Sequence, residues 1–444
     1  MQEFDVVVIG AGISGLSTAA LLSKAGFNVS VYESFALGGR ATTMDMNGML
    51  VDLGSHICPG GERGEIATLM RYVGGHVNII PFEDKLIYFN GRLSRESDLI
   101  SSKETEKEVD RIQTDIYSMT FEDTEVIDNV PFGDWIDERT ENEEAKEYFF
   151  IHSYVMTSLP SPYEQSAGCV ARRIQDWLRC GIRAGYPEGG FISFSRELSE
   201  AITRIGGHLN LNTQVKEIIT EDGVAKGVKI RVNGEEKEVR SKIVVSSLPV
   251  WDNFKLIPEE EFPTWFVKRV RYLEDDSFFA GIGIIARLKK PLYEGRMYVS
   301  ALKTPINKVT LQIWHPSNFT RSIVPEGKHL LTGGMILGRH DCMDRKEMKK
   351  ISKTYVDEIC TIFPDYDWED HCEWKTVAIS PKSLIDGVHR RPYQIGKQRP
   401  DNKSPIKNLF LCGDTVKSIG CGIDTPIRSA YFCVNSILRE VRGS

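Results

Sequence analysis

The sequence lacks the features that mark several large classes of protein. It has no basic stripe, and its formal net charge of −7 gives no reason to expect nucleic-acid binding. No apolar run approaches the ~20 residues that span a bilayer, although the composition leaves a peripheral membrane contact open. The nine cysteines include no C-x-x-C pair, which favours reduced thiols. We therefore expect a cytoplasmic protein without a metal site, in which any membrane contact is peripheral.

The sequence also lacks internal repeats, low-complexity linkers and a positively charged segment ahead of its first apolar run. Residues 4–9 therefore predict a strand rather than a targeting segment. The length of 444 residues suggests two or three domains, and a hydrophobic content of 41% provides for a large core. Because no linker separates the domains, we expect their segments to interleave along the chain.

The first thirty or so residues predict one βαβ unit. Residues 4–9 (FDVVVI) form an almost continuous apolar run, which is typical of a parallel strand buried on both faces. A glycine-rich turn over residues 10–15 leads into a helix over residues 16–25. A second strand over residues 28–32 then closes at Glu33.

The turn carries the pattern G-x-G-x-x-G, whose three glycines have separate physical tasks. Gly10 permits a tight turn, Gly12 lets a pyrophosphate approach the backbone, and Gly15 lets the helix pack closely on the strand. The helix N-terminus offers N–H groups and a partial positive charge to phosphates. Glu33 is placed to accept hydrogen bonds from ribose hydroxyls. The pattern therefore predicts dinucleotide binding, with a glycine-rich turn of another α/β protein as the alternative.

Two further segments extend this prediction. Gly38-Gly39-Arg40 brings backbone close to a ligand and supplies a cation for a phosphate, which suits a cofactor longer than NAD. Near the other end, an apolar strand over residues 408–411 leads to Gly413-Asp414, a glycine-rich loop and a helix over residues 426–440. We expect Thr425 to be the N-cap of that helix. A surface loop and a purely structural terminal helix are the respective alternatives.

These segments resemble the superfamily of flavin amine oxidases, protoporphyrinogen oxidases and phytoene desaturases, nearest the phytoene desaturase-like branch. At the N-terminus the resemblance rests on residues 10–15, Glu33, Gly38-Gly39-Arg40 and Asp52-x-Gly54-x-His56. It recurs at residues 187–190 (PEGG), 206–215 and 246–249. The resemblance implies an FAD-binding fold, with Val215 contacting adenine through its backbone and Asp414 near the ribityl or pyrophosphate region. The helix N-terminus near residue 424 would face the N1 and C2 carbonyl edge of the flavin.

No cysteine or histidine stands where flavin is usually attached covalently, so we expect noncovalent FAD. The expected FAD contacts are Gly10, Ala11, Gly12, Ile13, Ser14, Gly15, Glu33, Ser34, Gly38, Gly39, Arg40, Gly54, Ser55, His56, Val215, Gly413, Asp414, Gly422, Ile423 and Asp424.

No motif identifies the catalytic residues. His56 and Asp424 are candidates for proton chemistry, with a scaffold histidine and a helix-terminal charge as the alternatives. Arg172, Arg173 and Arg183 are candidates for contact with a substrate carboxylate or phosphate, and a surface ion pair is the more common role for such residues.

The resemblance implies an α/β protein: a Rossmann-type FAD-binding domain with an interleaved α+β substrate domain of antiparallel sheet plus helices. We expect the FAD-binding domain to comprise residues 1–60, 187–250 and 396–444. The substrate domain would take residues 61–186, which read as mostly helical, and residues 251–395, which read as β-rich. A single helix is expected over residues 347–363.

We expect an FAD-dependent oxidoreductase that removes hydride from a small or lipophilic organic substrate, of the desaturase or dehydrogenase type. Electrons would pass to oxygen, a quinone or a carrier protein. An amine oxidase or protoporphyrinogen oxidase-type enzyme is one alternative, and a non-redox FAD-dependent isomerase or structural FAD binder is another. An apolar tunnel would favour polyenes, whereas paired carboxylates or aromatics would favour amines. The sequence does not indicate the oligomeric state.

The purified protein should be yellow, and denaturation should release intact FAD into the supernatant, because no covalent link is expected. Absorbance spectra before and after acid precipitation measure this directly. Flavin that stays with the precipitated chain would contradict noncovalent binding. A colourless protein that takes up no added FAD would contradict FAD binding itself.

Overall fold

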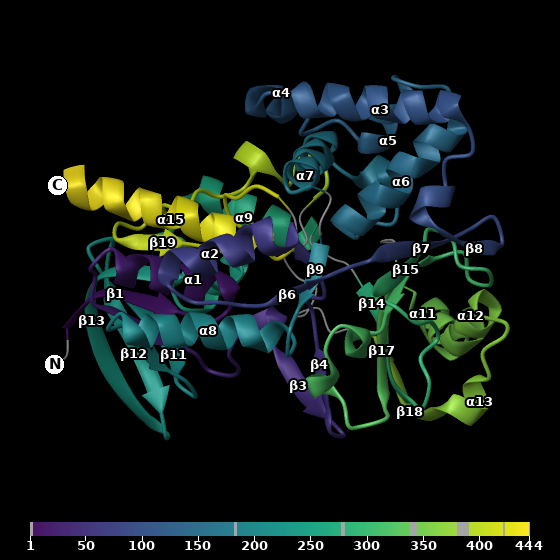
Figure 1. Cartoon of the computed structure of the whole chain (residues 1–444). Helices are drawn as coiled ribbons and strands as arrows, with labels where there is room; N and C mark the ends of the chain where they lie inside the picture. The colour runs from purple at the N-terminus through teal and green to yellow at the C-terminus, as the bar shows by residue number, and fades with distance from the viewer. Residues whose placement is uncertain are drawn as a thin grey trace.

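The computed structural model describes residues 3–181, 184–276, 280–337, 344–379, 390–420 and 422–443. Arg183 lies outside these ranges. Two seven-stranded sheets organise the chain and lie at opposite ends of the molecule (Figure 1). Across the described ranges, no helix combines the length and apolar character needed to cross a bilayer.

The first sheet has the strand order β10-β2-β1-β13-β12-β11, with β19 paired to β13. Strands β10, β2, β1, β13 and β19 run parallel, and β11 and β12 extend the sheet as an antiparallel hairpin. The strands are β1 (Glu3–Ile9), β2 (Val29–Tyr32), β10 (His208–Asn210), β11 (Gln214–Glu221), β12 (Val224–Val232), β13 (Glu235–Ser246) and β19 (Leu409–Leu411). The predicted βαβ unit and its parallel pairing are confirmed.

Strand β1 is buried on both faces, as its apolar run predicts. Val6 and Val8 pack into a core with the helices on one face, whereas Val7 and Ile9 pack into a second core on the other. Burying each such side chain contributes about 1.5–3 kcal/mol relative to leaving it exposed. The alternation of side chains along one strand therefore holds two layers to the same sheet.

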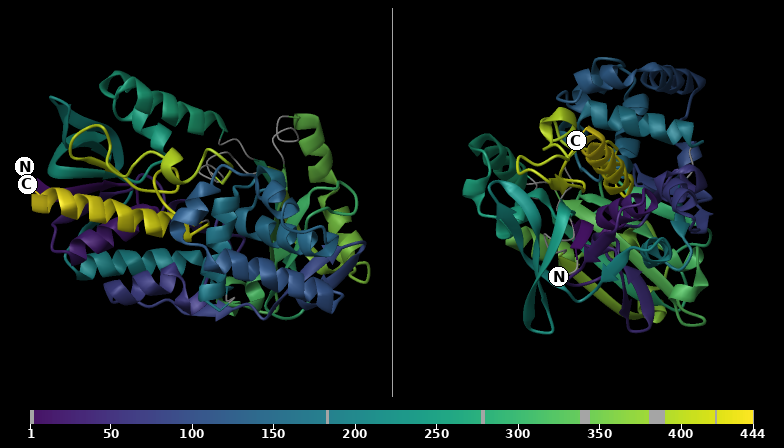
Figure 2. Two further views of the ribbon diagram at one scale, coloured as in Figure 1. Left: turned by 90° about the horizontal axis from the view of Figure 1, so that it is seen from above. Right: turned by 90° about the vertical axis from the view of Figure 1, so that its left-hand side faces the viewer.

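Four helices cover one face of the first sheet, and their apolar sides share its core. They are α1 (Ile13–Lys24), α2 (Glu65–Val73), α8 (Phe191–Arg204) and α15 (Asp424–Gly443). Helix α15 lies against α1, so the two ends of the chain meet in one layer (Figures 1 and 2). The opposite face is covered by the β11–β12 hairpin and by α9 (Thr264–Asp276).

Helix α15 begins earlier than predicted. Its first residue is Asp424, so Thr425 lies inside the helix and the predicted N-cap at Thr425 is wrong. The first helical turn starts before Thr425, because Gly422 adopts φ +66° and its carbonyl oxygen already accepts the N–H of Thr425. Asp424 thereby becomes the acidic residue at the N-terminus of the helix, where its charge is favourable.

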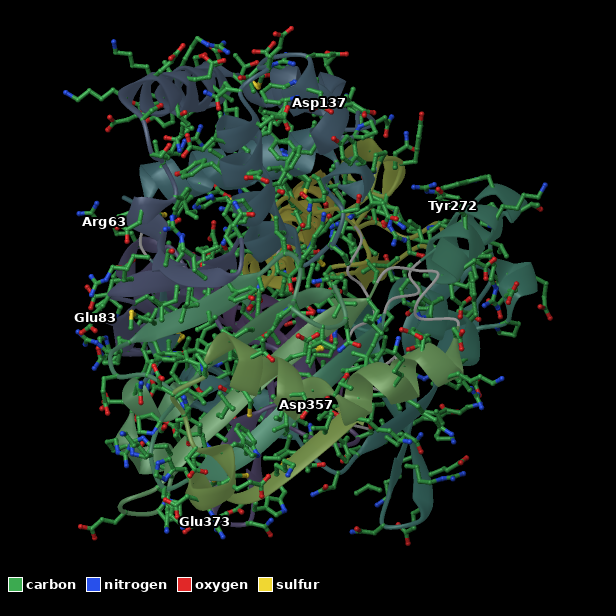
Figure 3. All side chains as sticks on the ribbon, turned by 90° about the vertical axis from the view of Figure 1, so that its right-hand side faces the viewer. Arg63, Glu83, Asp137, Tyr272, Asp357 and Glu373 are labelled. Atoms are coloured by element: carbon green, nitrogen blue, oxygen red, sulfur yellow. The ribbon has the colours of Figure 1, made fainter. Side chains whose placement is uncertain are left out.

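The second sheet has the order β18-β14-β17-β16-β15-β7-β8 and is antiparallel except for the β7–β15 pair. Its strands are β7 (Asp84–Phe89), β8 (Arg92–Arg95), β14 (Ala280–Leu288), β15 (Met297–Ala301), β16 (Thr310–Trp314), β17 (His329–Leu337) and β18 (Cys372–Ile379). Its outer face carries the helices α11 (Arg345–Lys353), α12 (Tyr355–Ile362) and α13 (Trp368–His371). Figure 3 looks onto this face, with Asp357 on α12 in front and Glu373 on β18 at the lower rim.

The single helix predicted over residues 347–363 is in fact two helices. Thr354 ends α11 and precedes α12, and its hydroxyl donates to the carbonyl of Lys350. A threonine that bonds back to the preceding turn bends or ends a helix. Glu358 then accepts backbone N–H groups from Ile306 and Asn307, which fixes the new direction of α12.

A helical layer lies above the second sheet and the middle of the molecule in Figure 1, and most of its helices share one apolar core. The helices are α3 (Lys103–Ser118), α4 (Phe121–Val126), α5 (Phe132–Asp137), α6 (Glu143–Thr157) and α7 (Ala167–Arg179). Each large sheet forms one body of the molecule together with the helices that cover it. A hairpin and a small sheet lie at the junction of these two bodies. The hairpin consists of β3 (Thr43–Met46) and β4 (Met49–Asp52), and the small sheet consists of β5 (Cys58–Pro59), β9 (Ala184–Pro187) and β6 (Ile79–Pro81).

The chain crosses between the two bodies several times, as the expected interleaving requires. The fold class, a Rossmann-type α/β domain with an interleaved substrate domain, is confirmed. Helices α2 and α9 pack with the first sheet although both lie in segments assigned to the substrate domain. The domain boundaries near residues 60 and 250 stay a prediction.

Asp52 ties three segments of the junction together. Its carboxylate accepts hydrogen bonds from the hydroxyls of Thr43 and Tyr186 and, at 3.0 Å, from the N–H of Phe191 at the start of α8. Asp52 is buried, and burial raises its pKa to about 6, although these hydrogen bonds oppose the shift. One carboxyl group therefore links β3, β9 and α8.

We expect Asp52→Ala to lower the free energy of unfolding by about 3 kcal/mol, because three buried donors lose their acceptor. Urea denaturation of the apoprotein measures the change. Asp45→Ala, which removes an exposed aspartate from the neighbouring strand β3, is the matched control and should have little effect.

This loss should be larger at pH 5 than at pH 8. The folded-state pKa of Asp52 lies above its unfolded value, so ionising the carboxyl penalises the folded state. The stability that the protonated group contributes is present at low pH and disappears as the pH rises through about 6. Equal losses at both pH values would show that burial does not raise the pKa of Asp52.

Candidate functional site

The glycine-rich turn after β1 has the geometry that its sequence predicts. Gly10 adopts φ +93°, a conformation that favours glycine. A Cβ atom on Gly15 would lie 2.1 Å from the carbonyl oxygen of Gly10, so this helix position admits only glycine. Gly12 holds the N-cap position of α1 and has no side chain to accept from the first N–H groups. Those N–H groups are therefore available to an anion.

Glu33 lies at the end of β2, directly beside this turn. Its Oε2 accepts the N–H of Ala11 at 2.8 Å, and its Oε1 accepts the N–H of Phe35 at 2.7 Å. The carbonyl oxygen of Glu33 accepts the N–H of Thr213 at 2.8 Å, which brings the segment preceding Val215 to the same strand end. The structure thus places Glu33 and Val215 in one region, as expected for two residues near adenosine.

Gly38 and Gly39 lie against the turn from the other side. Gly38 pairs with Gly12 in an isolated parallel bridge, and its N–H donates to the carbonyl of Ala11 at 2.9 Å. A Cβ atom on Gly39 would lie 3.1 Å from the Cα of Gly12. The two glycine segments therefore approach each other backbone to backbone.

Arg40 connects this region to the far end of the chain. Its Nη2 lies 2.7 Å from Oδ1 of Asp414, and Gly413 donates its N–H to Ser429 of α15 at 3.0 Å. Gly54 packs against the backbone of Arg40, since a Cβ there would lie 2.5 Å from the Arg40 carbonyl oxygen. Arg40 and Asp414 are 374 positions apart in the sequence, so two motifs from opposite ends of the chain meet at this ion pair.

These residues fit an extended dinucleotide. The path from Glu33 past Gly12 and Gly39 to Arg40 is lined by backbone, by the N-terminus of α1 and by a cation. The side chains of Ile13 and Ser14 point into the core, so these two residues can offer backbone N–H groups. Ser34 is exposed at the edge of the path. A pyrophosphate at α1 with adenosine towards Glu33 suits this arrangement.

The path ends at a cavity of about 710 Å³ between the two bodies. Gly54, Ser55 and His56 line it on one side, together with Gly422, Ile423 and Asp424 from the start of α15. Its floor is formed by β14, β16 and β17 of the second sheet, and α6 and α7 close it from above. All of the predicted flavin-ring contacts therefore meet at a single cavity.

His56 faces this cavity in a neutral environment. Its ring lies 4.4 Å from the ring of Trp314, and its buried Nδ1 has no hydrogen-bond partner in the described part of the chain. Burial lowers the pKa of His56 to about 4. The imidazole is therefore uncharged at neutral pH and can offer or accept a hydrogen bond.

Asp424 is buried at the cavity wall with one oxygen paired. Its Oδ2 lies 2.8 Å from Nη1 of Arg173, whereas Oδ1 has no partner among the residues that the structure describes. Burial raises the pKa of Asp424 to about 6, against the charges of Arg173 and Arg428. Arg428 itself bridges Glu65 at 2.7 Å and Asp176 at 2.6 Å.

The expectation of surface ion pairs for Arg172 and Arg173 is wrong. Arg172 is buried and paired with Asp128, and Arg173 is largely buried and paired with Asp424. Both lie on α7, whose inward faces pack against the rest of the protein instead of facing solvent. Arg173 lines the cavity, so its contact with a ligand stays a prediction.

Sequence reasoning named Arg173 as a candidate for ligand contact but missed most of the rest of the cavity wall. Helix α7 and its C-cap contribute Arg173, Asp176, Trp177 and Cys180, which lie at positions i, i+3, i+4 and i+7 and so share one helical face. Lys85 and His152 join them from β7 and α6. The spacing on α7 could have indicated this part of the wall, because polar and aromatic side chains that share one face of a buried helix need polar groups opposite them.

Comparison with known proteins shows what this arrangement is similar to. The family model for flavin-containing amine oxidoreductases matches residues 13–438. The chain is 26% identical to a chloroplastic prolycopene isomerase of Daucus carota, over 99% of this chain and 81% of the relative. It is 21% identical to a 15-cis-phytoene desaturase of Solanum lycopersicum, over 99% and 78%. An oxidoreductase of Methanosarcina mazei shares the fold, with a TM-score of 0.80, 21% identity and coverage of 99% and 100%.

We expect Glu33→Ala to weaken FAD binding about ten- to a hundredfold, because hydrogen bonds to a charged acceptor contribute about 1.5–3 kcal/mol. Titration of the folded apoprotein with FAD, followed by flavin fluorescence, measures the affinity. Glu217→Ala removes an exposed acid from the same sheet and should leave the affinity unchanged. If Glu33→Ala binds FAD like the unaltered protein, Glu33 does not belong to the site.

Proposed function

The chain belongs to the flavin-containing amine oxidoreductase family, and on this premise we propose that it is an FAD-dependent dehydrogenase or desaturase acting on a small organic substrate. The family resemblance and the FAD cofactor predicted from the sequence are confirmed by this membership. The substrate class, the direction of the reaction and noncovalent attachment belong to the proposal.

The cavity is the observation that carries the proposal. Its volume of about 710 Å³ lies in the range of about 300–1,000 Å³ that is usual for small-molecule sites. Because the same space would also hold the flavin ring, the remainder suits a small organic molecule better than a long polyene enclosed end to end. Its floor is mainly apolar, and most of its charged groups come from the helices α7 and α15, the start of α2 and the strand β7.

The floor owes its shape to glycines. Gly283 and Gly334 are paired across β14 and β17. A side chain at Gly334 would meet no atom within 4 Å, so this position faces open space at the cavity. Bare backbone thus makes room for the flat body of a substrate against the second sheet.

Bound flavin supplies the capacity to take up a hydride or electrons and to pass them on. Asp424 is suited to hold a proton at its unpaired Oδ1, because its pKa of about 6 lies near neutral pH. Arg173 orients that carboxyl group through Oδ2. Neutral His56 and Trp314 lie against each other in the cavity lining and help to exclude water.

The electron acceptor in this proposal is oxygen, a quinone or a carrier protein. The proposed reaction involves neither a nucleic acid nor a metal ion. Peripheral contact with a membrane stays open within the proposal, as does the oligomeric state. A single G-x-G-x-x-G motif is consistent with an acceptor other than a pyridine nucleotide.

Non-redox isomerisation is the second candidate. It is favoured by the relative named prolycopene isomerase, which aligns with 99% of this chain. The two reactions leave different traces on the cofactor. A dehydrogenase leaves its flavin reduced when oxygen is absent, whereas an isomerase returns product with the flavin unchanged.

We expect anaerobic mixing of the FAD-loaded protein with a panel of small organic substrates to bleach the flavin with at least one of them. Gly334→Leu should then slow flavin reduction about ten- to a hundredfold, because the added side chain displaces the substrate from its reactive position. Stopped-flow absorbance measures both effects.

Gly334→Ala is the graded control and should give a smaller effect than leucine, with thermal unfolding confirming that both variants fold. A flavin that no substrate reduces, in a protein that nonetheless converts a substrate to its isomer, would replace the first candidate by the second. Equal rates for the two variants and the unaltered protein would place the substrate elsewhere.

A further inference from the structure

Three ionisable side chains meet on the substrate-domain wall of the cavity, apart from the Arg173–Asp424 pair. They are Lys85 of β7, Glu96 of the 3₁₀ turn η3 (Glu96–Asp98) and His152 of α6, and we call them the Lys85 cluster. Lys85 and His152 line the cavity, and Glu96 lies between them. Nothing in the proposed chemistry uses these residues.

His152 is buried with an acceptor at each ring nitrogen. Its Nδ1 lies 2.6 Å from the carbonyl oxygen of Tyr148, and its Nε2 contacts Oε1 of Glu96. A carbonyl oxygen cannot donate, and an ionised carboxylate cannot donate either. Each ring nitrogen of His152 therefore faces an oxygen acceptor, and the two contacts hold the ring in place.

Glu96 keeps its negative charge because of its contacts with His152 and Lys85. Burial opposes ionisation, but the hydrogen bond from His152 and the charges of His152 and Lys85 outweigh it and lower the pKa of Glu96 to about 2. The cluster therefore holds the positive charge of Lys85 beside the ionised carboxylate of Glu96.

Lys85 is the member that can present this charge to a ligand. Its Nζ lies 2.7 Å from Oε1 of Glu96 and 4.6 Å from the ring centre of Trp177. An ammonium group has three N–H donors, so one contact to Glu96 leaves donors for a further acceptor. Its side chain is 17% exposed, and Lys85 is one of the residues that line the cavity.

We propose that the Lys85 cluster is the subsite for a carboxylate group on the ligand that fills the cavity. Lys85 would donate to the carboxylate, Glu96 would fix the position of the ammonium group, and His152 would hold Glu96 in place. The assignment deepens the proposed function, on which it rests for the claim that this ligand is the substrate.

The position of the cluster sets the length of such a ligand. Trp177, which lies under Lys85, and Arg173, which holds Asp424, are one turn apart on α7, or about 6 Å along its axis. A carboxylate at Lys85 therefore places the next few carbon atoms beside Asp424 and the glycine floor. The substrate class that results is a short carboxylic acid with an apolar body.

Hexanoate and the uncharged hexanamide are suitable probes, because they differ in charge but share the same apolar tail. We expect isothermal titration of the FAD-loaded protein to show at least about tenfold tighter binding of hexanoate than of hexanamide. Lys85→Met should weaken hexanoate binding about ten- to a hundredfold and leave hexanamide binding nearly unchanged. Lys85→Arg should retain most of the affinity for hexanoate.

The matched control is Lys328→Met, which removes a lysine of the same domain that is paired with Glu373 outside the cavity lining. It should bind hexanoate like the unaltered protein. Equal binding of hexanoate and hexanamide, no binding of either probe, or unaltered hexanoate binding by Lys85→Met would each overturn the carboxylate subsite.

Titration reports binding without turnover, so the two proposals fail separately. If hexanoate binds through Lys85 but no carboxylic acid reduces the flavin, the subsite stands and the proposed reaction falls. If a substrate without a carboxylate reduces the flavin and Lys85→Met has no effect on hexanoate binding, the proposed reaction stands and the subsite falls.

Discussion

The structure depends on the backbone contact between Gly12 and the Gly38-Gly39 segment. This contact holds the N-terminus of α1 beside Arg40, and Arg40 in turn reaches Asp414 from the other end of the chain. Because Arg40 and Asp414 are partly exposed, their ion pair contributes little to stability. We interpret the pair as a means of positioning: the two charges hold each other in place where an anionic cofactor would pass.

The cavity beyond this contact combines bare backbone with buried charge. Buried ion pairs such as Arg173–Asp424 are weak evidence for stability, because the loss of hydration opposes the attraction between the charges. A protein that needed only a stable core could fill these positions with apolar side chains. The presence of Glu65, Asp176 and Arg428 around Asp424 therefore fits the proposed role of Asp424, a carboxyl group whose protonation state can change near neutral pH.

Local patterns predicted the segments that the structure brings together along the proposed cofactor path, but they did not predict the helical wall of the cavity. The turn after β1, Glu33 and the strand leading to Asp414 are each recognisable because a short segment imposes its own geometry. Lys85 and His152 carry no such local signal, since they come from different elements and meet only after the helical layer has packed on the second sheet. The errors at Thr425 and Thr354 have a related cause. In both, contacts around one turn moved a helix boundary that composition alone had placed elsewhere.

The charged groups in the cavity give more direct evidence about the class of substrate than the names of the relatives do. A hydrocarbon polyene in this space would leave the unpaired oxygen of Asp424 without a partner and would give Lys85 no acceptor beyond Glu96, and burying unpaired polar groups is costly. A carboxylic acid with an apolar body satisfies Lys85 at one end and covers the glycine floor with the other. The sequence is 26% identical to a relative named for isomerisation and 21% identical to one named for desaturation. The polar wall therefore favours a substrate that carries its own charged group, whichever of the two reactions the bound flavin performs.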